Sequence, residues 1–213
     1  MKKLNNITAG LVCLALSAGV MAQGVTDDEV VLGTSTALSG PAALWGVSAS
    51  RAAQIRFDMA NESGGVHGRQ IRVVLEDHQY QVPIHVKAMN KLLNLDKVFA
   101  TFNVLGTPMN LATAETQFAK NVPMMFPMTT AKSVQEPEHD LKITFGSSYY
   151  NQIRFAVGNF LATGRTSACV MYQDTAYGTE VLEAVTDEVA EHSGVSLVSS
   201  FAHKPTEIGR AHV

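Results

Sequence analysis

Three loop-like segments contain the residue types in this chain that are best suited to hold a small molecule. Thr36–Gly46 includes Trp45, the single tryptophan; the other two segments are Gly106-Thr107-Pro108 and Met128-Thr129-Thr130-Ala131. A threonine followed by proline is typical of a helix start, with Thr107 as the N-cap, and the free amides there favour a carboxylate. Trp45 is either a flat apolar wall for a ligand or a core-capping residue, and the sequence favours neither.

Motifs of common enzymes do not match the chain. Gly46–Ser50 lacks the closing glycine of a nucleophile elbow, and Gly64–Gly68 lies between an expected helix and a strand, the wrong place for a dinucleotide loop. Asp77, His78 and His85 have a spacing that fits no zinc framework and is more typical of a solvated loop at a strand end. We therefore expect neither catalysis nor a metal or other cofactor.

Short apolar runs alternate with segments of helical periodicity along the chain. Strands are expected over residues 30–32, 71–75, 98–102, 123–126, 168–172 and 195–198. Apolar helical faces are expected at Ala52, Ile55 and Met59; at Val82, Val86, Met89 and Leu93; at Leu111, Ala114 and Phe118; at Ile153, Val157 and Phe160; and at Val181, Val185 and Val189. This alternation predicts an α/β fold with parallel strands, in which ligands bind beyond the carboxyl ends of the strands.

The composition indicates a folded globular protein and excludes several other classes. The chain has 213 residues, of which 46% are hydrophobic and 16% charged, so it can bury a core in one large or two modest domains. The net charge of −3 is spread without basic runs, which argues against nucleic acid as a partner.

The first 22 residues have the order of regions found in secretory signal peptides. Lys2 and Lys3 precede an apolar stretch from Ile7 to Val20, and small residues suit cleavage before Gln23. The stretch is too short to span a bilayer. We therefore expect a protein that is exported to the periplasm or another extracytoplasmic space.

The two cysteines give little scope for thiol chemistry. Cys13 lies in the expected leader, and Leu11 and Val12 before it lack the small residue of a lipoprotein cleavage site. Cys169 would then be alone and could form no internal disulfide. Because it lies in an apolar run, Cys169 is expected to be a small buried side chain.

Several motifs taken together resemble the extracytoplasmic substrate-binding proteins of ABC importers. These are Ser39-Gly40-Pro41, the stretch Asn61–Arg69 (NESGGVHGR), Glu76-Asp77 and Tyr172–Gly178 (YQDTAYG). The similarity runs from about Val30 to Phe201 and is greatest for the branched-chain amino acid type, the Leu/Ile/Val-binding proteins with the type I periplasmic-binding-protein fold.

This resemblance implies two hinged α/β lobes that close on a small ligand and then dock on a membrane permease. The first lobe would comprise residues 23–146 and the second 147–206, with a helix starting at about Tyr149. The expected ligand is a small amino acid, an amide or a related carboxylate, bound by a monomer. An alternative with the same fold is the ligand-sensing domain of a receptor or regulator, and a hydrolase would need a nucleophile and a base converging in the cleft.

The resemblance also assigns roles to individual residues. Trp45 would flank the ligand, Met128 and Thr130 would hold its carboxylate through backbone and side chain, and Tyr177 would face them from the second lobe. Gly106 departs from the pattern because a hydroxyl is common there, and Thr107 is the substitute. Thr129, next to Thr130, offers a further hydroxyl. The candidate ligand-binding set is therefore Trp45, Gly106, Thr107, Met128, Thr129, Thr130 and Tyr177.

Proteins of this type continue well beyond Phe201 to complete both lobes. Residues 207–213 resemble the translation of a sequencing-library adapter. We therefore expect a truncated chain with a non-native tail, in which the rest of the second lobe's site is missing.

Overall fold

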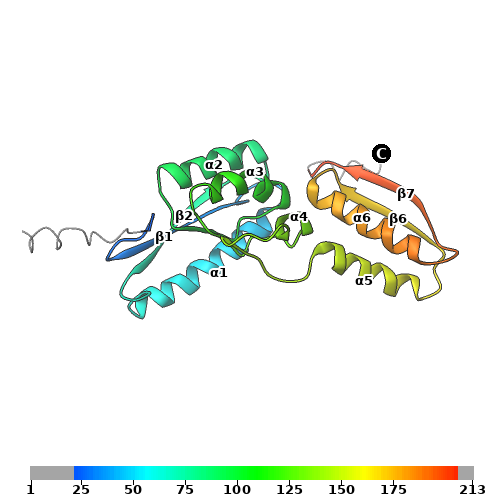
Figure 1. Cartoon of the computed structure of the whole chain (residues 1–213), viewed down its shortest axis with the longest axis horizontal. Coiled ribbons are helices and arrows are strands. Elements are labelled where there is room, and N and C mark those ends of the chain that lie inside the picture. The colour runs from blue at the N-terminus through cyan, green and yellow to red at the C-terminus, as the bar shows by residue number, and fades with distance from the viewer. Residues whose placement is uncertain (1–21, 206–213) are drawn as a thin grey trace, which may run out of the picture.

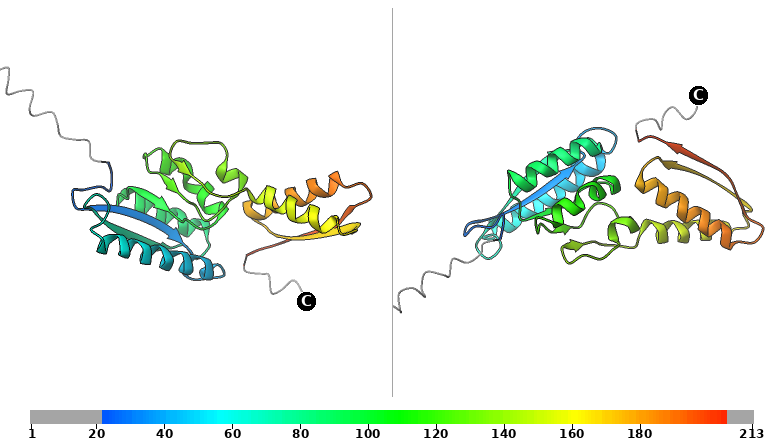
Figure 2. Two further views of the ribbon diagram at one scale, coloured as in Figure 1. Left: turned by 90° about the horizontal axis from the view of Figure 1, so that it is seen from below. Right: turned by 45° about the horizontal axis from the view of Figure 1, so that its top comes forward.

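The computed structural model describes residues 22–205, so the expected tail and nearly all of the expected leader lie outside the described residues. The described chain has two separate parallel sheets, and we call the part built on each sheet a lobe. Figure 2 shows the two lobes lying end to end. In residues 22–205, no helix is both long and apolar enough to cross a membrane.

The first lobe has a five-stranded parallel sheet in the order β2-β1-β3-β4-β5. Figure 1 shows α1 on one side of this sheet and α2 with α3 on the other. Met89, Leu92 and Val98 are in the main core, between α2 and the sheet. The elements are β1 (Glu29–Thr36), α1 (Ala43–Glu62), β2 (Gln70–Asp77), α2 (Val82–Asn94), β3 (Ala100–Phe102), α3 (Thr107–Phe118), β4 (Met124–Met125), α4 (Lys132–Gln135) and β5 (Lys142–Ile143).

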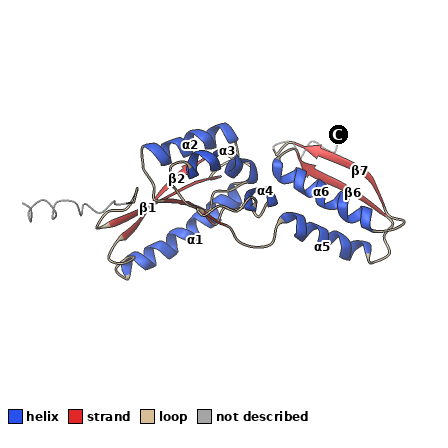
Figure 3. Cartoon of the chain, viewed as in Figure 1, coloured by secondary structure: helices blue, strands red, loops and turns tan. Residues whose placement is uncertain are grey.

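The second lobe packs two helices against one face of a two-stranded parallel sheet (Figure 3). Its elements are α5 (Tyr149–Leu161), β6 (Ser167–Gln173), α6 (Ala176–Glu191) and β7 (Ser196–His203). The core contains Leu161, Val170, Val185 and Val189. The Ser148 hydroxyl accepts a hydrogen bond from the Asn151 amide and caps α5, which begins at Tyr149 as expected.

The predicted α/β fold with parallel strands is confirmed. The sequence pattern missed α4, because four residues are too few to show a periodicity, and it missed β5, because Lys142–Ile143 does not lie in a continuous apolar run. The expected N-cap of α3 was wrong by one position. Gly106 occupies the cap, with φ of 105° and no side-chain cap bond, and Thr107 is the first helical residue.

Two expectations of burial were wrong. Cys169 is exposed, because β6 turns Val170 toward the helices and Cys169 to the opposite face of the sheet. The predicted apolar face of α1 is also exposed at Ile55 and Met59. Within the described residues, nothing covers either surface.

The expectation of a solvated loop around His78 and His85 was also wrong. Both side chains have an exposed fraction of 0%. His85 lies 3.0 Å from the Ser35 hydroxyl through Nδ1 and 3.0 Å from the Thr113 hydroxyl through Nε2, so both ring nitrogens have partners. Burial, together with the neighbouring His78, lowers the pKa of His85 from 6.5 to about 3.

The pH dependence of folding should reflect this buried neutral histidine. As pH falls below about 6.5, His85 becomes protonated in the unfolded chain, whereas in the folded chain it stays neutral until about pH 3. The folded state therefore loses stability as pH falls from about 6.5 to about 3. We expect the free energy of unfolding, measured with denaturant, to fall more steeply between pH 7 and pH 4 for the natural chain than for His85→Gln. Equal slopes would show that His85 is not held neutral.

The open face of the β6–β7 sheet carries exposed apolar side chains, so we expect the purified 213-residue chain to self-associate. Met171 and Phe201 are register partners and are 52% and 54% exposed. Light scattering over a concentration series should show association of the chain, and the double variant Met171→Lys with Phe201→Lys should reduce it. A chain that stays monomeric at every concentration would contradict this prediction.

Candidate functional site

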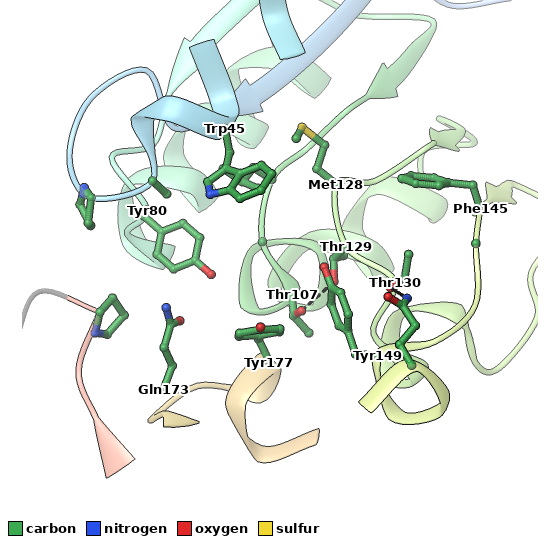
Figure 4. A pocket seen from close by; sticks show the side chains of 17 residues that line it. Trp45, Tyr80, Thr107, Met128, Thr129, Thr130, Phe145, Tyr149, Gln173 and Tyr177 are labelled. Carbon is green, nitrogen blue, oxygen red and sulfur yellow. Dashed lines mark hydrogen bonds between the residues drawn. The ribbon is translucent and has the colours of Figure 1, made fainter. Parts of the chain in front are cut away.

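A cavity of about 780 Å³ lies beyond the carboxyl ends of the strands, where the two lobes meet. Its volume falls within the range of small-molecule sites. Figure 4 shows its wall, with Trp45 and Tyr177 on opposite sides. The structure brings together all seven residues of the expected set, because each of the following lines this cavity: Trp45, Gly106, Thr107, Met128, Thr129, Thr130 and Tyr177.

Four helices begin at the cavity. Trp45 is in the first turn of α1, Thr107 in that of α3, Tyr149 in that of α5 and Tyr177 in that of α6. The first amides of a helix have no intrahelical acceptor, and the helix dipole adds positive potential at that end. The helix ends therefore supply a positive potential suited to an anionic group, although none of the described residues that line the cavity carries a positive charge.

The two lobes use the same local device to present an aromatic ring. Trp45 precedes Gly46 in α1, and Tyr177 precedes Gly178 in α6. A Cβ atom at Gly46 would overlap the carbonyl of Ala37, and one at Gly178 would overlap the carbonyl of Gln173. The glycines therefore let each helix start against the end of the preceding strand, which places the aromatic ring at the cavity. Trp45 is 65% exposed and does not cap the core.

The hydroxyl groups of Thr107 and Thr129 form a buried pair. Their Oγ1 atoms are 2.8 Å apart, and Thr129 also accepts a hydrogen bond from the Ala131 amide at 3.2 Å. One proton is used within the pair, so one hydroxyl proton stays available to an acceptor in the cavity. The two threonines thus act as a single donor.

Thr130 presents a second donor. Its Oγ1 accepts a hydrogen bond from Gln152 Nε2 at 3.2 Å, which leaves the hydroxyl proton of Thr130 free. Gln152 is fixed in turn because Nε2 also donates to the Ser147 carbonyl at 2.6 Å. The Thr130 carbonyl accepts from the Tyr149 amide, which ties this segment to the start of α5.

Gly106 is a structural requirement of the cavity wall. Its φ of 105° is unfavourable for other residues, and a Cβ atom would lie 3.0 Å from Met109 Sδ and 3.2 Å from Tyr80 Cε2. A hydroxyl side chain at this position would therefore need a strained backbone and a shift of Met109 or Tyr80, and Thr107 provides a hydroxyl from the next position. Met128 joins this turn through its carbonyl, which accepts from the Gly106 amide at 3.4 Å.

Sequence reasoning missed several residues of the wall, including Tyr80, Phe145, Tyr149, Gln152 and Gln173. Gln173 ends β6 and Tyr80 follows β2 by three residues, so the rule that ligands bind at strand ends could have found both. Tyr149 and Gln152 follow β5, which lies in the alternating apolar and polar stretch Leu141–Phe145 (LKITF), a strand signal that a search for continuous apolar runs passes over.

The wall contains no ionised side chain within the described residues. Burial, with the nearby Tyr149 ring, raises the pKa of both Tyr80 and Tyr177, so these phenols remain neutral donors. In residues 22–205, the hydroxyls of Tyr80, Tyr149 and Tyr177 have no hydrogen-bond partner, and the buried Gln173 Oε1 also lacks one. The described residues also hold no cluster of potential metal ligands.

Glu180 links the lobes beside the cavity. This buried residue of α6 accepts hydrogen bonds from the Lys132 amide at 2.9 and 3.1 Å and from the Tyr150 amide at 2.9 Å. Its carboxylate thus caps α4 in the first lobe and α5 in the second. The rings of Tyr149 in α5 and Tyr177 in α6 also pack edge to face, with their centroids 5.1 Å apart.

Solved structures with the same fold have different ligands in their names. A fatty acid ABC transporter substrate-binding protein from Thermomonospora curvata is 26% identical with a TM-score of 0.79, and the match covers 88% of this chain and 47% of that one. A branched chain amino acid ABC transporter from Thermus thermophilus with bound valine is 18% identical (TM-score 0.74; 86% and 47% covered). A solute binding protein from Rhodopseudomonas palustris BisB5 with 3,4-dihydroxy benzoic acid is 20% identical (TM-score 0.71; 84% and 48% covered).

The chain spans about half the length of these structures. No curated protein matches it. The family model for periplasmic binding proteins matches residues 29–209, which include every element and every cavity residue described above. The chain therefore belongs to the periplasmic binding protein family.

Proposed function

We propose that this protein is the extracytoplasmic solute-binding component of an ABC transporter. It binds a small amino acid, an amide or a related carboxylate between its lobes and delivers it to a membrane permease. The observation that carries this proposal is the convergence of four helix N-termini and two hydroxyl donors on an aromatic cavity with uncharged walls. The family and the named solved structures support the transport role.

The ligand's acidic or amide end fits the part of the cavity next to Thr107 and Thr130. There the free hydroxyl protons and the first amides of α3 can donate to one oxygen-bearing group. The apolar body of the ligand then lies between Trp45 and Tyr177, which face each other across the cavity (Figure 4). Aromatic rings on two lobes can cover both sides of such a body and link closure to occupancy.

Residues 23–146 and 147–206 are the two domains of this proposal. Periplasmic binding proteins work outside the cytoplasm, which agrees with the leader expected before Gln23. We propose that the complete exported protein is a monomer that needs no cofactor and has a permease as its protein partner. An ammonium group of an amino acid ligand would need an acceptor, and the unpartnered Gln173 Oε1 is the candidate among the described residues.

Removing a wall or a donor should weaken binding. Trp45→Ala removes one of the two rings that face each other across the cavity, and Thr130→Val removes a hydrogen-bond donor. Each should cost about 1 to 3 kcal/mol, or roughly fivefold to 150-fold in affinity. Calorimetry on the complete exported protein, with leucine, valine, short amides, urea and aromatic acids as probes, measures this effect.

Two control variants match these substitutions outside the cavity. Phe155→Ala removes an exposed ring of α5, and Thr163→Val removes a hydroxyl that bonds the Phe160 carbonyl. Both should leave affinity unchanged. Unchanged affinity in Trp45→Ala and Thr130→Val as well would place the ligand elsewhere.

A binding protein should release its ligand unaltered. We expect each probe that binds to be recovered quantitatively after prolonged incubation with the exported protein, as measured by mass spectrometry. Any product that forms in proportion to protein concentration, and is lost in Thr130→Val, would instead support an enzyme.

A further inference from the structure

The loop between β2 and α2 carries Tyr80 in an unusual backbone conformation. Gln79 and Tyr80 have φ angles of 53° and 58°, so two successive residues other than glycine occupy the left-handed region. Such residues are uncommon and are strained unless their surroundings hold them. Figure 4 shows the Tyr80 hydroxyl pointing into the cavity, toward Tyr177. This conformation is therefore what aims the ring at the ligand space.

Two adjacent side chains hold this turn. Asp77 Oδ1 accepts from the Gln79 amide at 2.9 Å, and His78 Nδ1 accepts from the Tyr80 amide at 2.9 Å. Asp77 is also anchored to the loop after β1 by the Leu38 amide and the Ser39 hydroxyl. Each left-handed residue thus has its amide bound by the side chain two positions before it.

The second ring nitrogen of His78 reaches the neighbouring Leu105–Gly106 turn, which also lines the cavity. His78 Nε2 lies 3.1 Å from the carbonyl of Leu105, the residue before Gly106. Since Nδ1 accepts a hydrogen bond from the Tyr80 amide, it carries no proton, and Nε2–H must donate to Leu105. Burial lowers the pKa of His78 against the opposing effects of Leu105 and Asp77, which keeps the ring neutral.

We propose that His78, in its Nε2-protonated form, is a positioning residue that fixes Tyr80 against the Leu105–Gly106 turn and so sets the shape of the ligand cavity. The packing supports this proposal, because the Tyr80 ring lies against Gly106, where a side chain on that glycine would extend. His78 itself does not line the cavity. The proposal rests on the proposed function for its effect on affinity, but its structural part can be tested without a ligand.

Two substitutions separate the two hydrogen bonds of His78. Asn places an acceptor at the position of Nδ1 and so keeps the Tyr80 bond, whereas Gln places a donor at the position of Nε2 and keeps the Leu105 bond. His85→Gln is the matched control, since His85 is equally buried and bonds Ser35 and Thr113, away from the wall.

Ligand-free measurements test the positioning directly. Nitrogen-15 NMR of the natural protein should show His78 protonated at Nε2 and not at Nδ1. Hydrogen exchange at the Tyr80 amide should be at least tenfold faster in His78→Gln than in His78→Asn or His85→Gln, at matched global stability. A proton on Nδ1, or equal exchange in all variants, would overturn the proposal.

Binding measurements test the effect on the cavity, with leucine and 3,4-dihydroxybenzoate as probes. For a probe that binds, His78→Gln, which loses the bond to Tyr80, should lower affinity about tenfold. His78→Asn, which keeps that bond and loses the one to Leu105, should lower it less, and His85→Gln should leave it unchanged. In a Tyr80→Ala background, His78→Gln should have no further effect, because the residue acts through Tyr80. An additive loss would overturn the proposal. Failure of both probes to bind would count against the proposed ligand class, while the NMR and exchange results would still decide the role of His78.

Discussion

The strands of both sheets pair in parallel, and the position of the cavity follows from this pairing. Because β1 to β5 all run in one direction, their carboxyl ends meet at one edge, and the helices that follow β1 and β3 begin there. The second lobe repeats the arrangement with β6 and α6. The cavity therefore receives helix N-termini from both lobes, so its positive potential comes from backbone amides, and the described residues that line it carry no charge.

The threonine hydroxyls of the cavity bond other protein groups and still keep protons that can be donated to a ligand. Thr107 and Thr129 satisfy each other and keep one proton free, and Gln152 satisfies the acceptor side of Thr130 and leaves its proton free. Buried hydroxyls that are held from one side can donate to a ligand with little loss of conformational freedom. The unbonded tyrosine hydroxyls add neutral donors around an apolar space. Such a wall suits a ligand with one polar end and an apolar body.

The cavity depends on contacts between the lobes as much as on either lobe alone. The carboxylate of Glu180, in α6, binds the amides at the starts of α4 and α5, and the Thr130 carbonyl binds the Tyr149 amide. A buried carboxylate that caps two helices loses favourable interactions at both when it is displaced. Any relative movement of the lobes therefore alters the same backbone segment that presents Thr130 to the ligand space.

Periodicity and helix-start signals are local properties of the chain, so the sequence was enough to predict the α/β alternation and the strand-end segments that contain Trp45, Thr107 and Thr130. It placed Trp45 in a loop, whereas Trp45 lies in the first turn of α1. It misassigned His78 to a solvated loop and missed Tyr80 and the supporting residues on α5. These depend on which distant segments meet: His78 bonds a carbonyl 27 residues away, and Gln152 a hydroxyl 22 residues away. Contacts of this kind form only in the folded chain, since packing brings those atoms within bonding distance and no local pattern encodes that approach.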